Sequence, residues 1–269
     1  MDTPKVNTPN AADSLFPLAP EVAGGYERNF IQQAVCELRF PTLMSLGESK
    51  PPAPFVSALR KRFPIIETLN EMTVVPGEKS ISGHSHQLMT TKQTWIVRLK
   101  ENAISIETSR YTAFSEFRDQ VKEVVSAAIP VIDSDFFTRI GLRYINIVKT
   151  DQTHITEWIN PKLIGPLDHQ GFTLISEYTG RLAMGADDGG CLLQHGMRNK
   201  PGINTPTDVT PDYLIDVDAY RTEVPATSVE SALNSIHRQG FSLFRWALGP
   251  KAIEYLERKE RLKRENDNA

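Results

Sequence analysis

The sequence predicts an α+β fold of two similar halves, with helices covering one face of an antiparallel sheet. Several short segments alternate apolar and polar residues, which is the pattern of a strand with one face in water. Two longer segments repeat their apolar residues at helical spacing. The order of the segments in the first part of the chain returns in the second part, roughly 95 to 115 residues later. We therefore expect two pseudo-repeated halves, each with a strand, a short helix, several antiparallel strands and a long helix.

The chain divides into four parts where its composition changes. Residues 1–25 contain four prolines and a glycine pair with few apolar residues, which favours a flexible N-terminal arm. Residues 26–132 are expected to form the first α+β half, and residues 133–256 the second. Residues 257–269 form a charged C-terminal tail, in which mixed-sign charges at helical spacing are typical of a solvated helix extension.

In the first half, Leu38 and Phe40 alternate with Glu37 and Arg39, as in a strand with one wet face. Apolar residues at helical spacing predict two helices, and Pro130 is expected to end the second one because proline cannot continue the hydrogen-bonded ladder. The predicted elements are a strand at 34–40, a helix at 55–63, a hairpin of strands at 95–99 and 103–107, and a helix at 114–128.

In the second half, the turn Asp187-Asp188-Gly189-Gly190 predicts another hairpin. The last helix has a buried stripe that includes Val229, Leu233 and Ile236, with Ser228 as its N-cap. The predicted elements are a strand at 140–146, a short helix at 155–163, strands at 172–183 and 191–197, a strand at 213–220 and the helix that follows Ser228.

A half-apolar antiparallel sheet must be covered on one face, and the helices are the only cover that this sequence offers. The other face is then expected to meet water. Its charged residues are predicted to be Glu37, Arg39, Arg98, Glu107, Arg143, Asp216 and Asp218. By analogy of architecture alone, the element order resembles the saddle-shaped fold of the TATA-box-binding protein and, less closely, helix-grip folds.

The composition is that of an ordinary packed globule, with 40% hydrophobic and 23% charged residues among 269. A formal net charge of −3 argues against a protein whose main work is to bind phosphate backbones. The longest apolar stretch, Val124 to Ile132, is too short and too interrupted to cross a bilayer. Because residues 1–20 also lack the apolar core of a signal peptide, we expect a cytoplasmic protein without a membrane partner.

Cys36 and Cys191 are the two cysteines, and each lies in an apolar, strand-like context. Two cysteines are too few for a disulfide framework. We therefore expect both to be buried thiols in a reducing compartment.

Asp216 and Asp218 lie two residues apart on a predicted strand, so both carboxylates project from one face. Together with Glu107 they form a candidate site for magnesium, which prefers oxygen ligands. The competing interpretation is that Arg39, Arg98 and Arg143 pair with these acids across the wet face. We favour the ion pairs.

His84 and His86 also lie two apart, a spacing that can present two imidazoles to one zinc ion. No neighbouring cysteine, aspartate or third histidine completes a tetrahedral set, so we expect a surface hairpin. No nucleophile motif is present, and the glycines at 185, 189 and 190 belong to a hairpin rather than to a phosphate-binding loop. The sequence therefore predicts no cofactor and no catalytic residue.

Three strand motifs carry a family resemblance. They are AVCELRF at 34–40, GLRYIN at 141–146 and LIDVDAY at 214–220. Over about residues 26–256 the chain resembles a sporadically distributed family of functionally uncharacterised bacterial proteins. The resemblance transfers no site, and the scattered occurrence of such a family implies an accessory role, for example in anti-phage defence. The proline-rich arm before Tyr26 departs from the shared pattern.

These observations predict a non-enzymatic binding or sensor module that recognises a protein partner, for example one encoded in the same operon. Its binding residues are expected to be Arg39, Arg98, Arg143, Asp216 and Asp218. One alternative is a metal-dependent hydrolase or nuclease that uses Glu107, Asp216 and Asp218. Another is a nucleic-acid-binding protein that uses the arginines of the wet face and the basic residues of the tail. An open sheet edge favours a homodimer that covers it.

Overall fold

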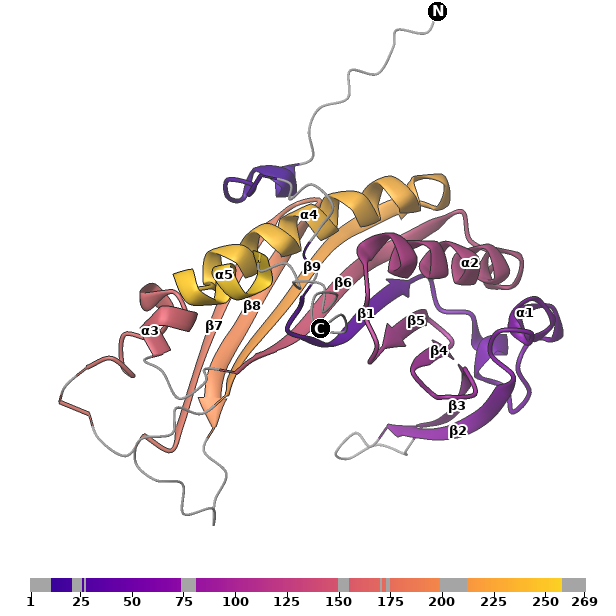
Figure 1. The fold of residues 1–269 in the computed structure, drawn as a ribbon. Helices are drawn as coiled ribbons and strands as arrows, with labels where there is room; N and C mark the ends of the chain where they lie inside the picture. Colours follow the sequence, from indigo (N-terminus) through magenta and orange to yellow (C-terminus); the bar gives the residue numbers. More distant parts are fainter. Residues whose placement is uncertain are drawn as a thin grey trace, which may run out of the picture.

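One antiparallel sheet forms the framework of the molecule (Figure 1). The structure is a computed structural model that describes residues 11–20, 26, 28–73, 81–149, 155–169, 171–172, 175–198 and 212–257. Within these residues nine strands pair in the order β2-β3-β4-β5-β1-β6-β9-β8-β7, so β1 and β6 are neighbours near the centre. The strands are β1 (Ile31–Arg39), β2 (Ile65–Thr73), β3 (Ile81–Met89), β4 (Trp95–Leu99), β5 (Ala103–Thr108), β6 (Phe136–Val148), β7 (Glu177–Ala186), β8 (Gly189–Arg198) and β9 (Tyr213–Pro225).

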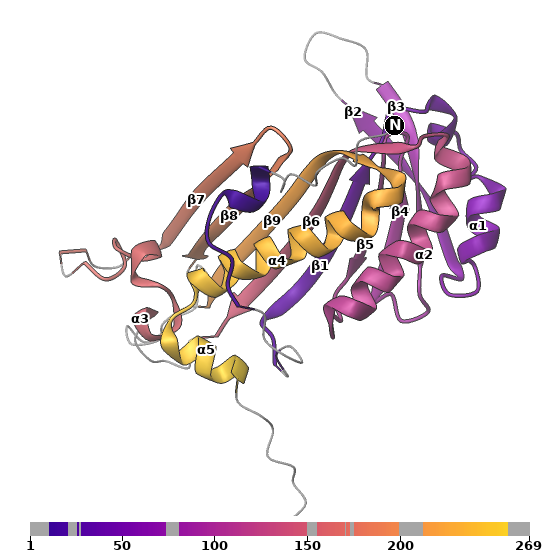
Figure 2. The same cartoon turned by 90° about the horizontal axis from the view of Figure 1, so that it is seen from above.

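The helices lie on one face of this sheet, which confirms the predicted α+β class (Figure 2). They are α1 (Ala53–Leu59), α2 (Phe114–Ile132), α3 (Ile155–Trp158), α4 (Val229–Ala247) and α5 (Pro250–Glu257). Helix α4 packs along β9 and β6, and α2 packs against α1 and β5. None of the helices in the described part of the chain combines the length and the apolar character that a bilayer-spanning helix requires.

Residue alternation assigns the two faces of the sheet, as the sequence predicted. Ala34, Cys36 and Leu38 of β1 are fully buried beneath the helices, whereas the residues between them point to the other face. The same alternation in β9 buries Ile215 and Val217. The buried side chains of both halves join in a single hydrophobic core between the sheet and its helices.

Helix α2 continues past Pro130, contrary to the predicted end of this helix. Pro130 cannot donate a hydrogen bond to the backbone oxygen of Ser126, so the helix loses one bond there and continues for only two more residues. Burial of Ile132, which is 2% exposed, holds that turn in place. The helix ends instead at Asp133, whose backbone is left-handed with φ of 47°.

Two predicted elements of the second half have different bounds. The helix expected at residues 155–163 consists of α3 and a separate 3-10 turn, Pro161–Leu163. Pro161 cannot donate a backbone hydrogen bond, and Asn160 caps the new turn by accepting one from the backbone nitrogen of Lys162 at 3.0 Å. The strand expected from residue 172 begins at Glu177, and residues 173 and 174 lie outside the described residues.

The prediction that His84 and His86 lie in a hairpin is confirmed, because β2 pairs antiparallel with β3, but the prediction of a surface position was wrong for His86. Both lie on β3, which pairs with β2 and β4 inside the sheet. His86 is fully buried, and its Nδ1 is 3.1 Å from the hydroxyl of Thr68. His84 donates from Nδ1 to the backbone oxygen of Gly47 at 3.1 Å. The surface prediction failed for His86 because the 3-10 turn Met44–Gly47, η2, packs against β3.

Part of the predicted flexible arm is packed against the sheet and α4. Residues 11–14 form a 3-10 helix, η1, beside α4 and over β8 (Figure 2). Ala12 is fully buried there, and Ala12 and Asp13 make polar contacts with the turn after β7, with β9 and with α4. Residues 1–10 and 21–25, and residues 258–269 of the predicted tail, lie outside the described residues.

Candidate functional site

The charged residues chosen from the sequence all lie on the uncovered face of the sheet. Strand register places Glu107, Val35, Arg143 and Asp218 side by side on β5, β1, β6 and β9. Asp216 lies two residues from Asp218 and shares its face. The structure therefore brings these side chains onto one surface.

On that surface, arginines and acids pair with each other. Arg143 donates to both carboxylate oxygens of Asp216, at 2.8 and 2.5 Å. Arg98 lies 3.0 Å from Glu107. These two pairs confirm the ion-pair interpretation. In each pair, the charge of the arginine is neutralised by an acid on a neighbouring strand. Arg39 pairs with an acid that was not expected, Glu37, at 2.7 Å.

Asp218 is paired with Arg139, which the sequence analysis did not select. The two side chains meet at 2.7 Å. Burial raises the pKa of Asp218, and the guanidinium of Arg139 opposes that rise. Arg139 could have been found, because it lies an even number of residues from Arg143 on the same strand and so shares its face.

The carboxylates proposed as metal ligands are thus engaged with arginines. Asp216 is 5% exposed, and both of its oxygens accept hydrogen bonds from Arg143. In the part of the chain that the structure describes, no group of three histidine, cysteine or acidic residues could hold a metal ion.

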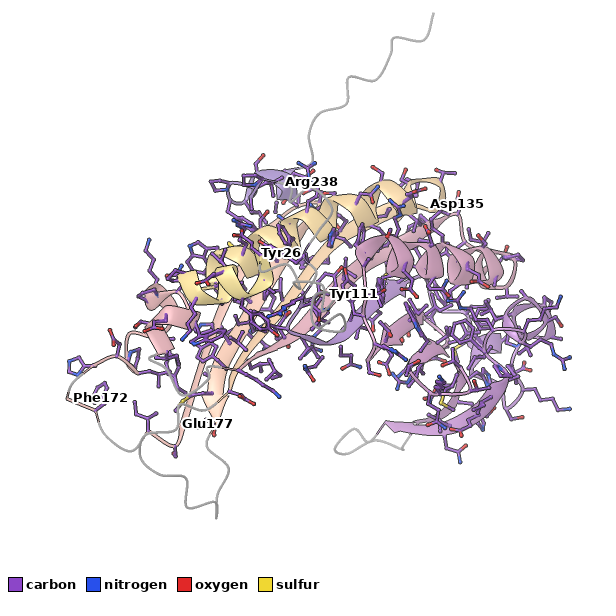
Figure 3. The ribbon with its side chains drawn as sticks, in the orientation of Figure 1. Tyr26, Tyr111, Asp135, Phe172, Glu177 and Arg238 are labelled. Atoms are coloured by element: carbon purple, nitrogen blue, oxygen red, sulfur yellow. The ribbon has the colours of Figure 1, made fainter. Side chains whose placement is uncertain are left out.

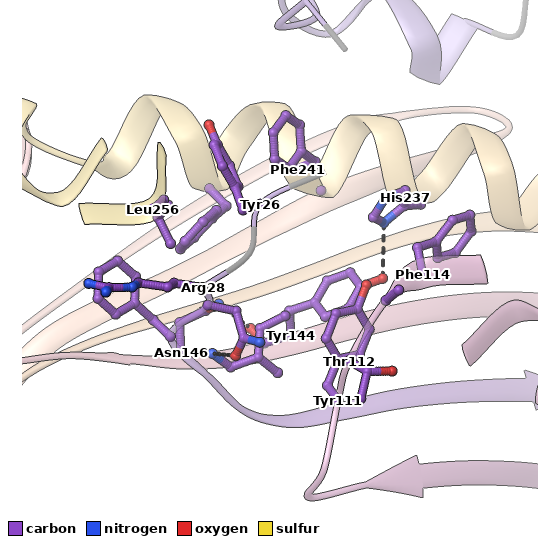
Figure 4. A pocket seen from close by; sticks show the side chains of 16 residues that line it. Tyr26, Arg28, Tyr111, Thr112, Phe114, Tyr144, Asn146, His237, Phe241 and Leu256 are labelled. Atoms are coloured by element: carbon purple, nitrogen blue, oxygen red, sulfur yellow. Dashed lines mark hydrogen bonds between the residues drawn. The ribbon is translucent and has the colours of Figure 1, made fainter. Parts of the chain in front are cut away.

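A pocket lies on the opposite, helix-covered side, between α4, the start of α2 and the central strands (Figure 4). Its volume is about 190 Å³. Tyr144 and Asn146 of β6 line it from the sheet, and His237 and Phe241 line it from α4. The other lining residues are Tyr26, Arg28, Asn29, Phe30, Ile31, Tyr111, Thr112, Ala113, Phe114, Gly240, Phe244 and Leu256.

Aromatic rings form about half of the pocket wall. Phe114 stacks on the imidazole of His237, with ring centroids 3.7 Å apart and planes within 7°. Tyr111 meets the edge of Tyr144 at 5.6 Å. Tyr111 lies near the start of α2 and Tyr26 lies beside α4, so two separate chain segments close the pocket at its sides (Figure 3).

A chain of three polar groups crosses this apolar surface. The hydroxyl of Tyr144 lies 3.0 Å from Nδ1 of His237 (Figure 4). It also shares a hydrogen bond with the hydroxyl of Tyr111. Burial lowers the pKa of His237 to about 4 and raises the pKa of Tyr111 to about 12. Burial also raises the pKa of Tyr144 well above its ordinary value. All three groups are therefore uncharged at neutral pH.

Arg28 contributes the positive charge of the pocket wall. Its guanidinium lies over the ring of Tyr255, 5.0 Å from the centroid, which orients the side chain without neutralising it. No ion pair involves Arg28 within the described residues. Nearby, Arg245 donates a hydrogen bond to the hydroxyl of Tyr26 and so ties the segment before β1 to α4.

Sequence reasoning missed this pocket, although two signals were present. His237 lies four residues after Leu233, on the buried stripe of the last helix, where an apolar residue is expected. Tyr144 has the phase of Leu142, which points to the covered face of its strand. Polar atoms at core positions mark a buried polar network, but which elements meet there follows only from the sheet order.

The fold and the pocket define an α+β protein with a small aromatic cavity between its sheet and its long helices. Comparison of the chain with models of protein families, with curated proteins and with solved structures gave no significant match.

Proposed function

We propose that the protein is a non-enzymatic binding module that holds a small aromatic ligand with an acidic group in the pocket beneath α4. The observation that carries this proposal is the uncharged Tyr111, Tyr144 and His237 chain set in a wall that also carries phenylalanine rings. Ligand sites commonly combine a mostly apolar lining with a few oriented polar groups. The pocket beneath α4 has this composition.

The lining determines the ligand chemistry that fits. Rings such as Phe114, Phe241 and Phe244 favour a flat aromatic group, because offset and edge contacts between rings add to the free energy of burial. The phenol and imidazole groups offer hydrogen bonds to a neutral donor or acceptor on that group. A charged group would lose its hydration there, so the acidic substituent is expected at Arg28.

The protonation state of the pocket supports binding rather than catalysis. A general base works best when its pKa lies near the working pH, whereas burial lowers the pKa of His237 to about 4. Cys36 and Cys191 are fully buried on other strands and do not line the pocket, and burial raises the pKa of both thiols. Neither cysteine is therefore a thiolate nucleophile.

Binding can be measured by calorimetry with two matched probes, indole and indole-3-acetate. We expect both to bind with a negative heat-capacity change, and indole-3-acetate to bind at least tenfold more tightly because its carboxylate reaches Arg28. The Arg28→Gln variant should remove that preference while leaving indole binding unchanged. Equal affinities of the two probes for both proteins would contradict the role given to Arg28.

A blocked pocket provides the second test. Ala113 is exposed at the pocket wall, so Ala113→Phe adds a ring at the mouth without disturbing the core. Ala58→Phe is the matched control, because Ala58 is also exposed but lies on α1, away from the pocket. Loss of probe binding in the first variant alone supports the proposal, and equal binding by both variants would overturn it.

A protein partner on the uncovered sheet face is the second function that we propose. Aliphatic side chains, among them Val35, Ile145 and Leu192, are half-buried there, and none of the described helices covers them. They alternate with charges that are already paired, which is the mixed surface of a protein interface rather than of a nucleic-acid site. Recovery of a partner from cell extract, compared between the wild type and Ile145→Asp, tests this surface. If the variant retains the same partner, the uncovered face is not the binding surface.

The same ion pairs bear on the nucleic-acid alternative. Arg98 and Arg143 already bind Glu107 and Asp216, so phosphate binding would have to break those pairs. Filter binding of DNA and RNA at two salt concentrations is the direct test, because real phosphate contacts weaken steeply with salt. We expect no salt-sensitive binding.

We also propose that the two halves are a pseudo-repeat. The sheet order supports it, because β1 and β6 begin the two halves and are neighbours, and each half extends outward from them. In each half, the last strand is also followed by a 19-residue helix, α2 or α4. The halves differ in having four and three further strands, so the analogy with the saddle-shaped fold of the TATA-box-binding protein extends to architecture only.

A further inference from the structure

A buried arginine on β9 is neutralised by a residue far away in sequence. Arg221 has a side chain that is 3% exposed, and it forms an ion pair with Asp13, 208 positions earlier. Its other hydrogen bonds go to the backbone oxygen of Tyr220 and the side-chain oxygen of Gln239, each at 2.8 Å, and to the hydroxyl of Ser235 at 2.9 Å. Asp13 is the carboxylate that pairs with Arg221 among the described residues.

The groups around Arg221 also hold the peptide backbone next to Asp13. The backbone nitrogen of Ala12 donates to a carboxylate oxygen of Asp188 at 2.8 Å. Gln239 donates from Nε2 to the backbone oxygen of Ala12. Ser235 donates to the carboxylate of Asp13 and so bridges that carboxylate to Arg221. Both backbone groups of one residue and the side chain of the next are thus recognised.

This recognition selects a particular pair of residues. Ala12 is fully buried, so a larger side chain has no room at its position. The carboxylate of Asp13 satisfies a buried guanidinium, and an uncharged replacement would leave that cation unpaired. The site therefore favours a segment in which a small residue is followed by an aspartate.

Outside Ala12 and Asp13, the segment contacts the rest of the protein through Phe16, which is half-buried and packs against the hydrophobic core. Of residues 11–20, only Ala12 is buried, and the remaining nine are exposed or half-buried. A further contact along the segment is the hydrogen bond from the backbone nitrogen of Ala19 to the hydroxyl of Ser242, at 2.8 Å. By contrast, Arg221, Ser235 and Gln239 belong to β9 and α4, which pack directly on each other.

We propose that β9, α4 and the turn between β7 and β8 form a binding site for an acidic peptide, which residues 11–14 of this chain occupy as a detachable latch. The sheet and α4 position every group that contacts Ala12 and Asp13. A bound peptide therefore has to supply only the carboxylate that pairs with Arg221. A peptide of the same chemistry competes for the site. This inference does not depend on a ligand in the pocket beneath α4.

The full chain with a protease recognition sequence inserted after Pro20 tests the latch. After cleavage we expect the N-terminal fragment to remain bound to the body at micromolar concentration, as seen by co-elution in size-exclusion chromatography. A fluorescent synthetic peptide of residues 8–20 should then displace it, as seen by anisotropy. The same peptide with Asp13→Asn should bind at least tenfold more weakly, because it cannot neutralise Arg221.

Two controls make the result decisive. The peptide with Ser14→Ala should bind as the wild type does, because Ser14 is exposed. The body variant Ser235→Ala, which loses the bridging hydroxyl, should bind the wild-type peptide several times more weakly. Equal binding of the wild-type and Asp13→Asn peptides would overturn the proposal. So would loss of the circular-dichroism signal of the body when the fragment leaves, because the site would then not be preformed.

Discussion

The hydroxyl of Tyr144 lies 3.0 Å from Nδ1 of His237, and this hydrogen bond joins the central strand β6 to the long helix α4 inside the pocket. It lies among aromatic rings, with Phe114 stacked on the imidazole. Both partners are therefore held in their uncharged forms, since burial lowers the pKa of His237 and raises that of Tyr144. The folded state is consequently sensitive to acid at this point.

The first prediction concerns that sensitivity. The unfolded chain binds a proton at His237 near the ordinary imidazole pKa of about 6.5, and the folded protein binds it only near pH 4. Between these values the unfolded state holds more protons, so the free energy of unfolding should decrease as the pH falls from about 6.5 towards 4. Urea titrations of the wild type at pH 7 and pH 4 should show a loss from this group on the order of 3 kcal/mol.

Other titrating groups contribute to the same curve, so a variant isolates the part due to His237. His237→Gln should flatten the pH dependence between 4 and 6.5 and should leave a hydrogen-bonding group opposite Tyr144. His169→Gln is the control, because His169 is exposed. A His237→Gln protein with the pH slope of the wild type would show that the imidazole does not resist protonation.

The second prediction concerns the uncovered face. The side chain of Asp216 is 7% exposed and is paired with Arg143, so each single change, Arg143→Gln or Asp216→Asn, should decrease the free energy of unfolding by about 1–3 kcal/mol. The double variant should lose less than the sum, because it leaves no unpaired charge. Urea unfolding of the four proteins measures this coupling.

The same variants test the metal alternative. Calorimetric titration with magnesium or manganese should give the same result for the wild type and for Asp216→Asn, because the carboxylate is already bound by Arg143. Metal binding by the wild type that disappears in Asp216→Asn and Asp218→Asn would instead support a metal-dependent function.

The third prediction concerns the thiols. Cys36 and Cys191 are 0% and 1% exposed, and burial raises the pKa of Cys191 to about 12 and that of Cys36 further. Because the thiolate is the reactive form, a thiol reagent such as Ellman's should react slowly with the native protein at pH 8. Both thiols should react rapidly in denaturing urea. Rapid reaction of one thiol in the native protein would show that its strand opens locally.

The sequence predicted the central part of the fold because local patterns decide it. The alternation around Cys36 in β1 and around Val217 in β9 follows directly from which face each strand buries. Features that depend on contacts with residues far away in the sequence were harder to predict. His86 is buried because η2 packs against β3, and α2 continues through Pro130 because Ile132 packs in the core.

The candidate sites show the same division. The charged uncovered face was predictable, since residues two apart on a strand share a face, as Asp216 and Asp218 do. The pocket was not, because Tyr111, Tyr144 and His237 come from three elements whose meeting depends on the whole sheet. The contact of Asp13 with Arg221 could not be predicted either. A proline-rich composition predicts a flexible segment but does not show which of its residues packs against the rest of the protein.

The fourth prediction compares two glycines that place opposite demands on a side chain. At Gly240 on α4, an added Cβ would meet Val217 and Ala219 at 3.7 and 3.8 Å, which is ordinary contact. Glycine within a helix is destabilising relative to alanine, so Gly240→Ala should increase the free energy of unfolding by roughly 0.5–1 kcal/mol. At Gly196 on β8, φ is +153° and an added Cβ would clash with the backbone oxygen of Tyr178. Gly196→Ala should therefore decrease the free energy of unfolding by roughly 2 kcal/mol or more. Urea unfolding of the two variants beside the wild type measures both signs, and a destabilised Gly240→Ala protein would show that α4 packs on β9 more closely than its contacts indicate.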